Sequence, residues 1–328
     1  MSTRNQLLNS VAGIIADYRS GEVAAPTSQH VERWINQFAQ PIQEPMLAEL
    51  NYALSRTYIS KATVESFLLG LLKSSSVVGN DPCAFWRGAK FLSIQGGGHS
   101  QREMLDLFDQ VLKKEYGLTT AQCGGTEPHT YLYLDDVLFT GSRIRNDLTT
   151  WINFSAPASA NVLVVTMGIH SGGQYFARTK IEEAARAAGK RITLTWRYAV
   201  EIEDRRAHTD VSDVLRPTSV PDDPATQAYV QSLGYAPVLR RPGSVGGKGF
   251  FSSEAGRNLL EQEFLKTGAY IRSICPHLGV YQRPLGNMVL QTLGFGAMIV
   301  TFRNCPNNAP LALWTGDPWY PLFPRKTN

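Results

Sequence analysis

The chain has 328 residues, of which 43% are hydrophobic and 18% are charged, a composition typical of an ordinary globular protein. Its formal net charge of +4 at pH 7 is small and dispersed, and does not favour direct nucleic-acid binding. No apolar run approaches the roughly 20 residues of a membrane helix, the first residues lack a signal-peptide pattern, and the four cysteines have no CxxC spacing. We therefore expect a cytoplasmic protein with reduced thiols and no membrane partner.

The first eighty residues are predicted to be helical. Apolar residues recur every three or four positions in the segments 5–18, 28–40, 44–58 and 62–74. A strong break, Gly79-Asn80-Asp81-Pro82, follows them. Residues 1–80 are therefore predicted to form a helical N-terminal lobe, which we expect to act as a partner or dimer surface rather than in catalysis.

Strand and helix patterns alternate between residues 81 and 202. Strands are predicted at 89–95, 131–134, 161–168 and 191–200, with helices at 100–117, 142–152 and 174–189 between them. Ser100 and Glu103 have the spacing of a capping box at the start of the first of these helices. This alternation predicts an α/β core with a mostly parallel sheet flanked by helices.

The three unusual loops of this core should lie at one edge of the sheet. Ligands of such sheets bind outside the carboxyl ends of the strands. Gln95–Gly98, Asp135–Ser142 and Gly168–Gly173 each follow a predicted strand. We expect them to converge there.

The alternation fades after residue 202. Residues 203–328 are predicted to form a C-terminal extension with one long helix at 253–274. Residues 239–253, "LRRPGSVGGKGFFSS", are glycine-rich and basic, and we expect them to be an exposed flap. The tail is rich in proline, asparagine and tryptophan and is expected to form a hood over the ligand.

The stretch "YLYLDDVLFTGSR", residues 131–143, carries the candidate site. Adjacent Asp135 and Asp136 repel each other unless both face water, a metal or a polyol, and they suit a sugar's vicinal hydroxyls or water on Mg²⁺. Thr140, Gly141 and Ser142 begin a predicted helix, whose free N–H groups suit a phosphate, and Arg143 adds positive charge. These residues predict a ribose-5-phosphate site with Mg²⁺ as cofactor, held by Asp135 and Asp136 through water.

This stretch resembles the phosphoribosyl-pyrophosphate (PRPP) signature of type I phosphoribosyltransferases, which has four apolar residues, two acids, four spacer residues and Thr-Gly. The resemblance implies that Asp135 and Asp136 hold the ribose hydroxyls and stabilise positive charge at ribose C1. It also implies that the Thr140–Ser142 loop holds the 5-phosphate. The upstream loop of Gln95, Gly96, Gly97 and Gly98 is then expected to hold pyrophosphate through its N–H groups.

Two departures from that family are visible. Arg143 stands where the family usually has a second threonine. Residues 118–130 are too short for the further strand and mobile catalytic loop that the family normally has there. Either another segment replaces the loop, such as the basic stretch with Arg241 and Lys248, or the transferase activity is lost or changed.

Over roughly residues 30–325 the chain resembles phosphoribosyltransferase-like proteins of prokaryotic conflict (anti-phage) operons, some of which accompany reverse transcriptases. The tail "RPLGN…GFGAMIVTFRNCPNNAPLALW…WYPLFPR" carries this resemblance. It implies an effector role in defence, with operon proteins such as a reverse transcriptase complex as partners. Arg303 and Asn304 of the tail are candidates for the hood, and His170 is a candidate acid–base residue.

Two functions follow as hypotheses. The first is an enzyme that binds PRPP or a ribose-5-phosphate nucleotide and acts at ribose C1, either as a phosphoribosyltransferase or as a nucleotide glycosidase. The second is a catalytically inactive sensor of a nucleotide or pentose phosphate that regulates a partner protein. The missing mobile loop favours the second hypothesis.

Overall fold

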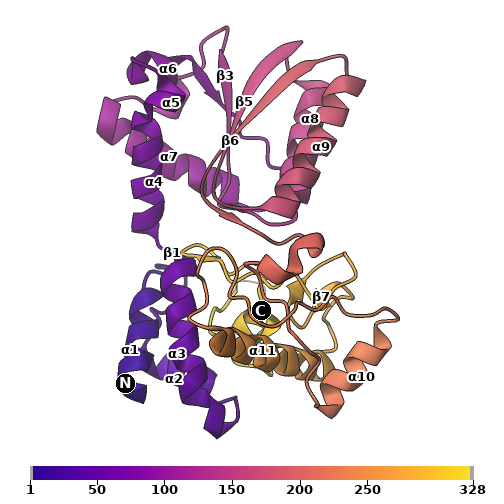
Figure 1. The fold of residues 1–328 in the computed structure, drawn as a ribbon. Coiled ribbons are helices and arrows are strands. Elements are labelled where there is room, and N and C mark those ends of the chain that lie inside the picture. Colours follow the sequence, from indigo (N-terminus) through magenta and orange to yellow (C-terminus); the bar gives the residue numbers. More distant parts are fainter. Residues whose placement is uncertain (1–2, 326–328) are drawn as a thin grey trace. The chain divides into compact units, whose positions relative to one another are not determined.

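The computed structural model describes residues 3–325. The chain divides into two compact units, each with its own core (Figure 1). Unit 1 combines the residues up to Ser60 with those from Ile202 onward, and unit 2 comprises Lys61–Glu201. This grouping differs from the expected division at residues 80 and 202, because residues 61–80 belong with the sheet and the first three helices belong with the C-terminal extension.

Unit 2 is built on a mostly parallel sheet, as the sequence predicted. β3 (Thr130–Leu134) lies between β2 (Ala89–Phe91) and β5 (Ser159–His170), and all three strands are parallel. β4 (Val137–Leu138) also pairs in parallel with β5, while β6 (Arg191–Ile202) pairs with β5 as well. The α/β expectation is confirmed.

Helices cover both faces of this sheet (Figure 1). α8 (Ser142–Phe154) and α9 (Ser171–Ala187) pack together and close a core that includes Tyr133, Val164 and Ile169. The rings of Trp86, Phe91 and Phe108 form an aromatic cluster elsewhere in the unit. The remaining helices of the unit are α4 (Lys61–Lys73), α5 (Ser75–Val78), α6 (Pro82–Gly88), α7 (Ser100–Tyr116) and the 3₁₀ helix η1 (Thr120–Gln122).

Unit 1 joins the two ends of the chain. β1 (Tyr58–Ile59) pairs in parallel with β9 (Val300–Thr301), and α3 (Gln40–Thr57) packs against α11 (Glu254–Ile274). The indole N–H of Trp34 donates to the carbonyl oxygen of Ala312 at 2.8 Å. The other elements are α1 (Arg4–Ile14), α2 (Ser28–Ile35), η2 (Arg206–Val211), α10 (Pro224–Ser232), β7 (Gln282–Arg283), β8 (Gly286–Asn287) and α12 (Leu311–Trp314).

A buried ion-pair network holds the glycine-rich stretch 239–253 in unit 1. Glu261 of α11 pairs at 2.8 Å with both Arg240 and Arg257, and all three side chains are fully buried. Phe250 and Phe251 are also buried. The stretch is therefore not a wholly exposed flap, because Arg240, Phe250 and Phe251 are buried in the core of unit 1.

One further property concerns membranes. Within residues 3–325, no helix combines the length and the apolar character that crossing a bilayer requires.

Candidate functional site

The two adjacent acids lie between β3 and β4, which both pair in parallel with β5. The register is unchanged from Leu134, which pairs with Val165, to Val137, which pairs with Gly168. Between them the amide of Asp135 donates to the carbonyl of Val165 at 3.1 Å, and the carbonyl of Asp136 accepts from Met167 at 2.8 Å. β5 therefore fixes the backbone of both acids, which lie directly after β3 as the sequence predicted.

The carboxyl group of Asp135 is buried beside a second acid. Burial, and then the charge of Asp136, raise its pKa from 3.8 to about 7. Hydrogen bonds from the Ser100 side chain and from the Asp136 amide, the latter 2.9 Å long, favour the ionised form. At pH 7 the Asp135 carboxyl is thus about half protonated, whereas a free aspartate is almost fully ionised, and a nearby cation or ligand hydroxyls would favour its ionised form.

The segment that follows the acids begins a helix suited to an anion. α8 starts at Ser142 after Gly141, whose φ of 74° is left-handed and which has no side chain to accept from the first-turn amides. The Thr140 hydroxyl lies 3.3 Å from that of Ser142. The Thr140 hydroxyl also accepts a long bond of 3.5 Å from the Ser142 amide. A helix of 13 residues that has a glycine as its N-cap and two hydroxyls beside its first turn can receive a phosphate.

Close backbone packing fixes the position of this helix start. A Cβ atom added to Gly141 would lie 2.2 Å from the carbonyl oxygen of Gly173. A Cβ added to Gly173 would lie 1.9 Å from the carbonyl oxygen of Phe139. Gly173 lies in the first turn of α9, so the starts of α8 and α9 are held side by side and the Asp135–Ser142 and Gly168–Gly173 stretches do come together.

Arg143 connects the helix start to the glycine loop. Its guanidinium donates to the carbonyl oxygen of Gly97. A Cβ added to Gly98 would lie 2.5 Å from Nη1 of Arg143. Gly96, Gly97 and Gly98 are all exposed. The residue that departs from the transferase signature therefore joins the two loops expected to bind phosphate groups.

Sequence reasoning missed several residues that shape this loop. The predicted capping box is wrong, because His99 is the N-cap of α7 and the Ser100 hydroxyl bonds to Asp135 instead. The Gln101 side-chain oxygen accepts from the amides of Ile94 and Gln95, at 2.8 and 3.0 Å. The signal that could have indicated this contact is the position of Gln101, three residues after the last glycine of the run, from which its side chain can accept from the loop amides.

Asp147 of α8 is a second missed residue. Its carboxylate accepts from the hydroxyl of Tyr133 at 2.7 Å and from the amide of Gly96 at 3.5 Å. Burial is the largest cause that raises the pKa of Tyr133 above its ordinary range, so the phenol remains a neutral donor. Asp147 and Tyr133 thus connect the glycine loop to the strand that carries the acid pair.

His170 does not lie in an open loop. β5 continues through it, the side chain is fully buried, and its Nδ1 lies 2.8 Å from the carbonyl oxygen of Leu138. The Phe139 ring lies 5.0 Å away. A histidine in this position braces β4, and its burial speaks against an acid–base role on a ligand.

The candidate flap and hood residues belong to unit 1. Arg241 and Lys248 are exposed, and the Lys248 amide donates to Asp213 at 2.8 Å. Arg303 and Asn304 are half-buried in the turn after β9, where the Asn304 amide donates to the carbonyl of Thr301 at 3.1 Å. Their roles over a ligand stay predictions.

The segment between α7 and β3 is short and well anchored. Thr120 in η1 donates through its amide to Asp109 at 2.6 Å. The Gly124 amide donates to the carbonyl of Arg87 at 2.8 Å. No strand lies within residues 117–129.

Mg²⁺ would need oxygen atoms from its substrate at this site. Among residues 3–325 there is no group of three or more His, Cys, Asp or Glu side chains that could hold a metal. Mg²⁺ is commonly bound by one or two carboxylates together with water and substrate phosphates. Buried Asp135 and half-buried Asp136 fit that pattern, because a cation would relieve the repulsion between their carboxylates.

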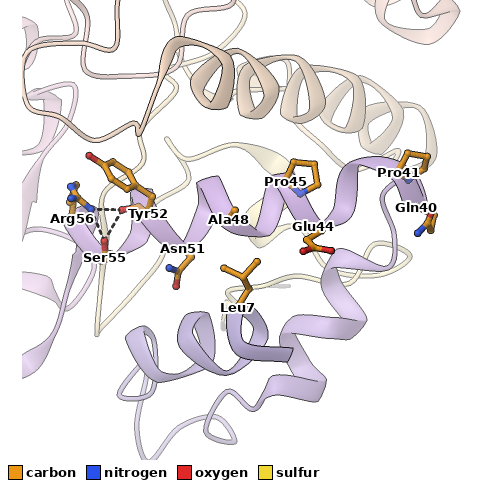
Figure 2. Close-up of a pocket in the computed structure, with 10 residues that line it drawn as sticks. All are labelled: Leu7, Gln40, Pro41, Glu44, Pro45, Ala48, Asn51, Tyr52, Ser55 and Arg56. Atoms are coloured by element: carbon orange, nitrogen blue, oxygen red, sulfur yellow. Dashed lines mark hydrogen bonds between the residues drawn. The ribbon is translucent and has the colours of Figure 1, made fainter. Parts of the chain in front are cut away.

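A separate hollow lies in unit 1 along the outer side of α3 (Figure 2). Its volume is about 800 Å³. Arg56 lies at one end, where its guanidinium is 3.5 Å from the centre of the Tyr52 ring, and Glu44 lies toward the other end. The hollow has no cluster of groups suited to catalysis, and its lining residues are Leu7, Gln40, Pro41, Glu44, Pro45, Ala48, Asn51, Tyr52, Ser55 and Arg56.

The comparisons with known proteins agree with the α/β architecture and with the motif. No curated protein and no solved structure matches the chain. The model of the PRTase-CE family matches residues 31–325, nearly the whole chain. The chain therefore belongs to the PRTase-CE family of phosphoribosyltransferase-like proteins.

Proposed function

We propose that this protein is an enzyme that binds PRPP or a ribose-5-phosphate nucleotide together with Mg²⁺ and acts at ribose C1. The adjacent acids Asp135 and Asp136 carry the proposal. Asp135, with its pKa raised to about 7 and its backbone fixed by β5, precedes the short strand β4 and then the helix start at Ser142, whose N-cap is a glycine. A carboxylate pair for a diol, followed by a phosphate site, suits a ribose 5-phosphate.

The chemistry follows from charge. Bond breaking at ribose C1 develops positive charge on the sugar ring, and two fixed carboxylates stabilise that charge. Mg²⁺, when bound, would neutralise a leaving pyrophosphate. Arg143 and the amides of Gly97 and Gly98 would orient the phosphate groups on the other side of the site. Transfer to a base and hydrolysis of a nucleotide's glycosidic bond both agree with this arrangement.

The decisive experiment measures turnover and binding with the same variants. The full chain is incubated with Mg²⁺ and PRPP across a panel of bases, and separately with nucleotides, and release of pyrophosphate or free base is followed. The Asp135→Asn/Asp136→Asn double variant should lose activity and affinity. Asp106→Asn, which neutralises an exposed acid on α7, is the matched control. Equal affinity of the double variant and the wild type for these ligands would refute the proposal.

A second candidate, a sensor without turnover, rests on the short anchored segment at residues 117–129. Transferases of the type that the signature resembles have a mobile catalytic loop there. A sensor would bind a nucleotide or pentose phosphate saturably, lose that binding in the double variant, and release no product with any substrate. A role as an effector in anti-phage defence is a further part of the proposal, and nucleotide depletion in cells that express the chain would test it.

A further inference from the structure

β6 is a long strand at the border of the unit 2 sheet. It spans the 12 residues Arg191–Ile202 and pairs with β5 on one side. Within residues 3–325 no other strand pairs with it. A long, open edge strand is a template for pairing with another chain, and natural proteins usually shorten or block such edges.

The direction of the backbone groups along β6 follows from two hydrogen bonds. The amide of Arg191 donates to the carbonyl of Ala158 at 2.8 Å, next to β5. Groups of alternate residues point to opposite sides of a strand, so the odd-numbered residues face β5 and the even-numbered residues, from 192 to 200, face the open side. The carbonyl of Trp196 agrees with this, because it accepts from the guanidinium of Arg197 at 3.1 Å.

The even-numbered side chains of β6 form a half-buried apolar row on the face of the sheet that α8 and α9 cover. Ile192, Leu194, Trp196 and Tyr198 pack on the core beneath α8 and α9, yet each is only partly buried. On the other face of the strand, Thr193, Thr195 and Ala199 are exposed, with Arg191 near one end. Near the other end, the Glu201 carboxylate accepts from the hydroxyls of Ser171 and Tyr198, at 3.1 and 3.3 Å.

We propose that β6 pairs with β6 of a second copy of this chain, antiparallel and centred on Trp196, which would join two sheets into one. In this register Ile192 lies opposite Val200 of the partner, and Leu194 lies opposite Tyr198 of the partner. The half-buried apolar row is then covered by its own copy.

Charge and the number of backbone hydrogen bonds together favour this register. Centring on Trp196 places Arg191 opposite the partner's Glu201 and Thr195 opposite the partner's Arg197. A shift that centres the pair on Leu194 places Arg191 opposite the partner's Arg197, which is repulsive. A shift that centres it on Tyr198 leaves Arg191 without an opposite acid. The favoured register also uses every open backbone group from residue 192 to residue 200, in about ten hydrogen bonds.

Position 195 allows a matched test, because Thr195 is exposed and lies opposite a partner arginine in the proposed dimer. Sedimentation of the full chain over a concentration series should show a dimer. Thr195→Arg, which adds a like charge at two symmetric positions, should raise the dimer dissociation constant roughly tenfold, whereas Thr195→Glu should lower it or leave it unchanged. Circular dichroism confirms that both variants are folded.

Cysteine cross-linking tests the register itself. Residues 195 and 197 would form a non-hydrogen-bonded pair across the interface, with Cα atoms about 4.5 Å apart, which suits a disulfide. The Thr195→Cys/Arg197→Cys variant should migrate as a covalent dimer on a non-reducing gel, and Thr193→Cys/Arg197→Cys should not. A wild-type chain that stays monomeric, or a dimer that neither responds to the charge at 195 nor cross-links, would overturn the proposal.

Discussion

Replacing Asp135 by asparagine should stabilise the fold in a manner that depends on pH. The pKa of Asp135 is about 7 in the folded chain and near 3.8 when the chain is unfolded. The folded state therefore holds this proton more tightly, and the carboxylate costs stability progressively as pH rises from 4 to 7. Above pH 7 the cost corresponds to roughly 4 kcal/mol, as an upper estimate.

Asparagine removes this cost and keeps an oxygen that can accept from the Asp136 amide, which now lies 2.9 Å from the carboxylate. We expect Asp135→Asn to be more stable than the wild type at pH 8, by up to about 4 kcal/mol, and equally stable at pH 4. Urea unfolding of both proteins, without Mg²⁺, at several pH values measures the difference. The difference between the unfolding free energies of the two proteins at each pH reports Asp135 alone, because the other titrating groups are common to both.

The reasoning would be refuted by a pH-independent difference between the two proteins, or by a variant that is less stable than the wild type at pH 8. The same variant should lose Mg²⁺-dependent binding of PRPP. If Asp135→Asn is more stable than the wild type but no longer binds PRPP, then the Asp135 carboxylate serves ligand binding and not the stability of the fold.

The other predictions concern packing, anion binding and buried charge. Gly173→Ala places a methyl group 1.9 Å from a backbone carbonyl, so it should destabilise unit 2 by about 2–3 kcal/mol in urea unfolding. Arg143→Ala removes the guanidinium that bonds to Gly97, so calorimetric titration with inorganic pyrophosphate should show affinity at least about tenfold lower and a shallower salt dependence. Glu261→Gln leaves the buried Arg257 without an acid and Arg240 with Glu254 alone, so it should destabilise unit 1 by about 3–5 kcal/mol in urea.

Each of these has a matched control. Gly70→Ala lies in α4 of the same unit, where an added Cβ meets nothing within 4 Å, so it should not destabilise the chain. Arg102→Ala removes an exposed arginine of α7 and should leave pyrophosphate affinity unchanged. Glu65→Gln changes an exposed acid whose nearest cation is 3.8 Å away, and its effect should stay within about 0.5 kcal/mol. A control that behaved like its test variant would contradict the corresponding explanation.

Local pattern was enough to predict the sheet of unit 2 and the start of α8. Apolar runs separated by turns indicate strands and helices because those preferences depend on near neighbours. The Thr140-Gly141-Ser142 turn was recognisable for the same reason: only glycine tolerates both the left-handed φ of 74° and the nearby Gly173 carbonyl.

Distant partners were not recognisable in this way. The pairing of Tyr58–Ile59 with Val300–Thr301 depends on two-residue strands far apart in the sequence, which leave no periodic signal. His170 looked like a loop residue because glycines follow it, yet it is the last residue of β5 and its side chain is fully buried. Ser100 had the spacing of a cap, but the buried acid beside it accepts its hydrogen bond instead.

The two separated segments of unit 1 impose an order on synthesis and folding. α1, α2 and α3 leave the ribosome first, but Trp34 must wait for Ala312 and β1 must wait for β9. The whole of unit 2 is made in between, which takes on the order of ten seconds at typical elongation rates. The early helices therefore expose apolar surface during that interval, and a nascent chain that stalls before residue 300 would be a natural client for chaperones.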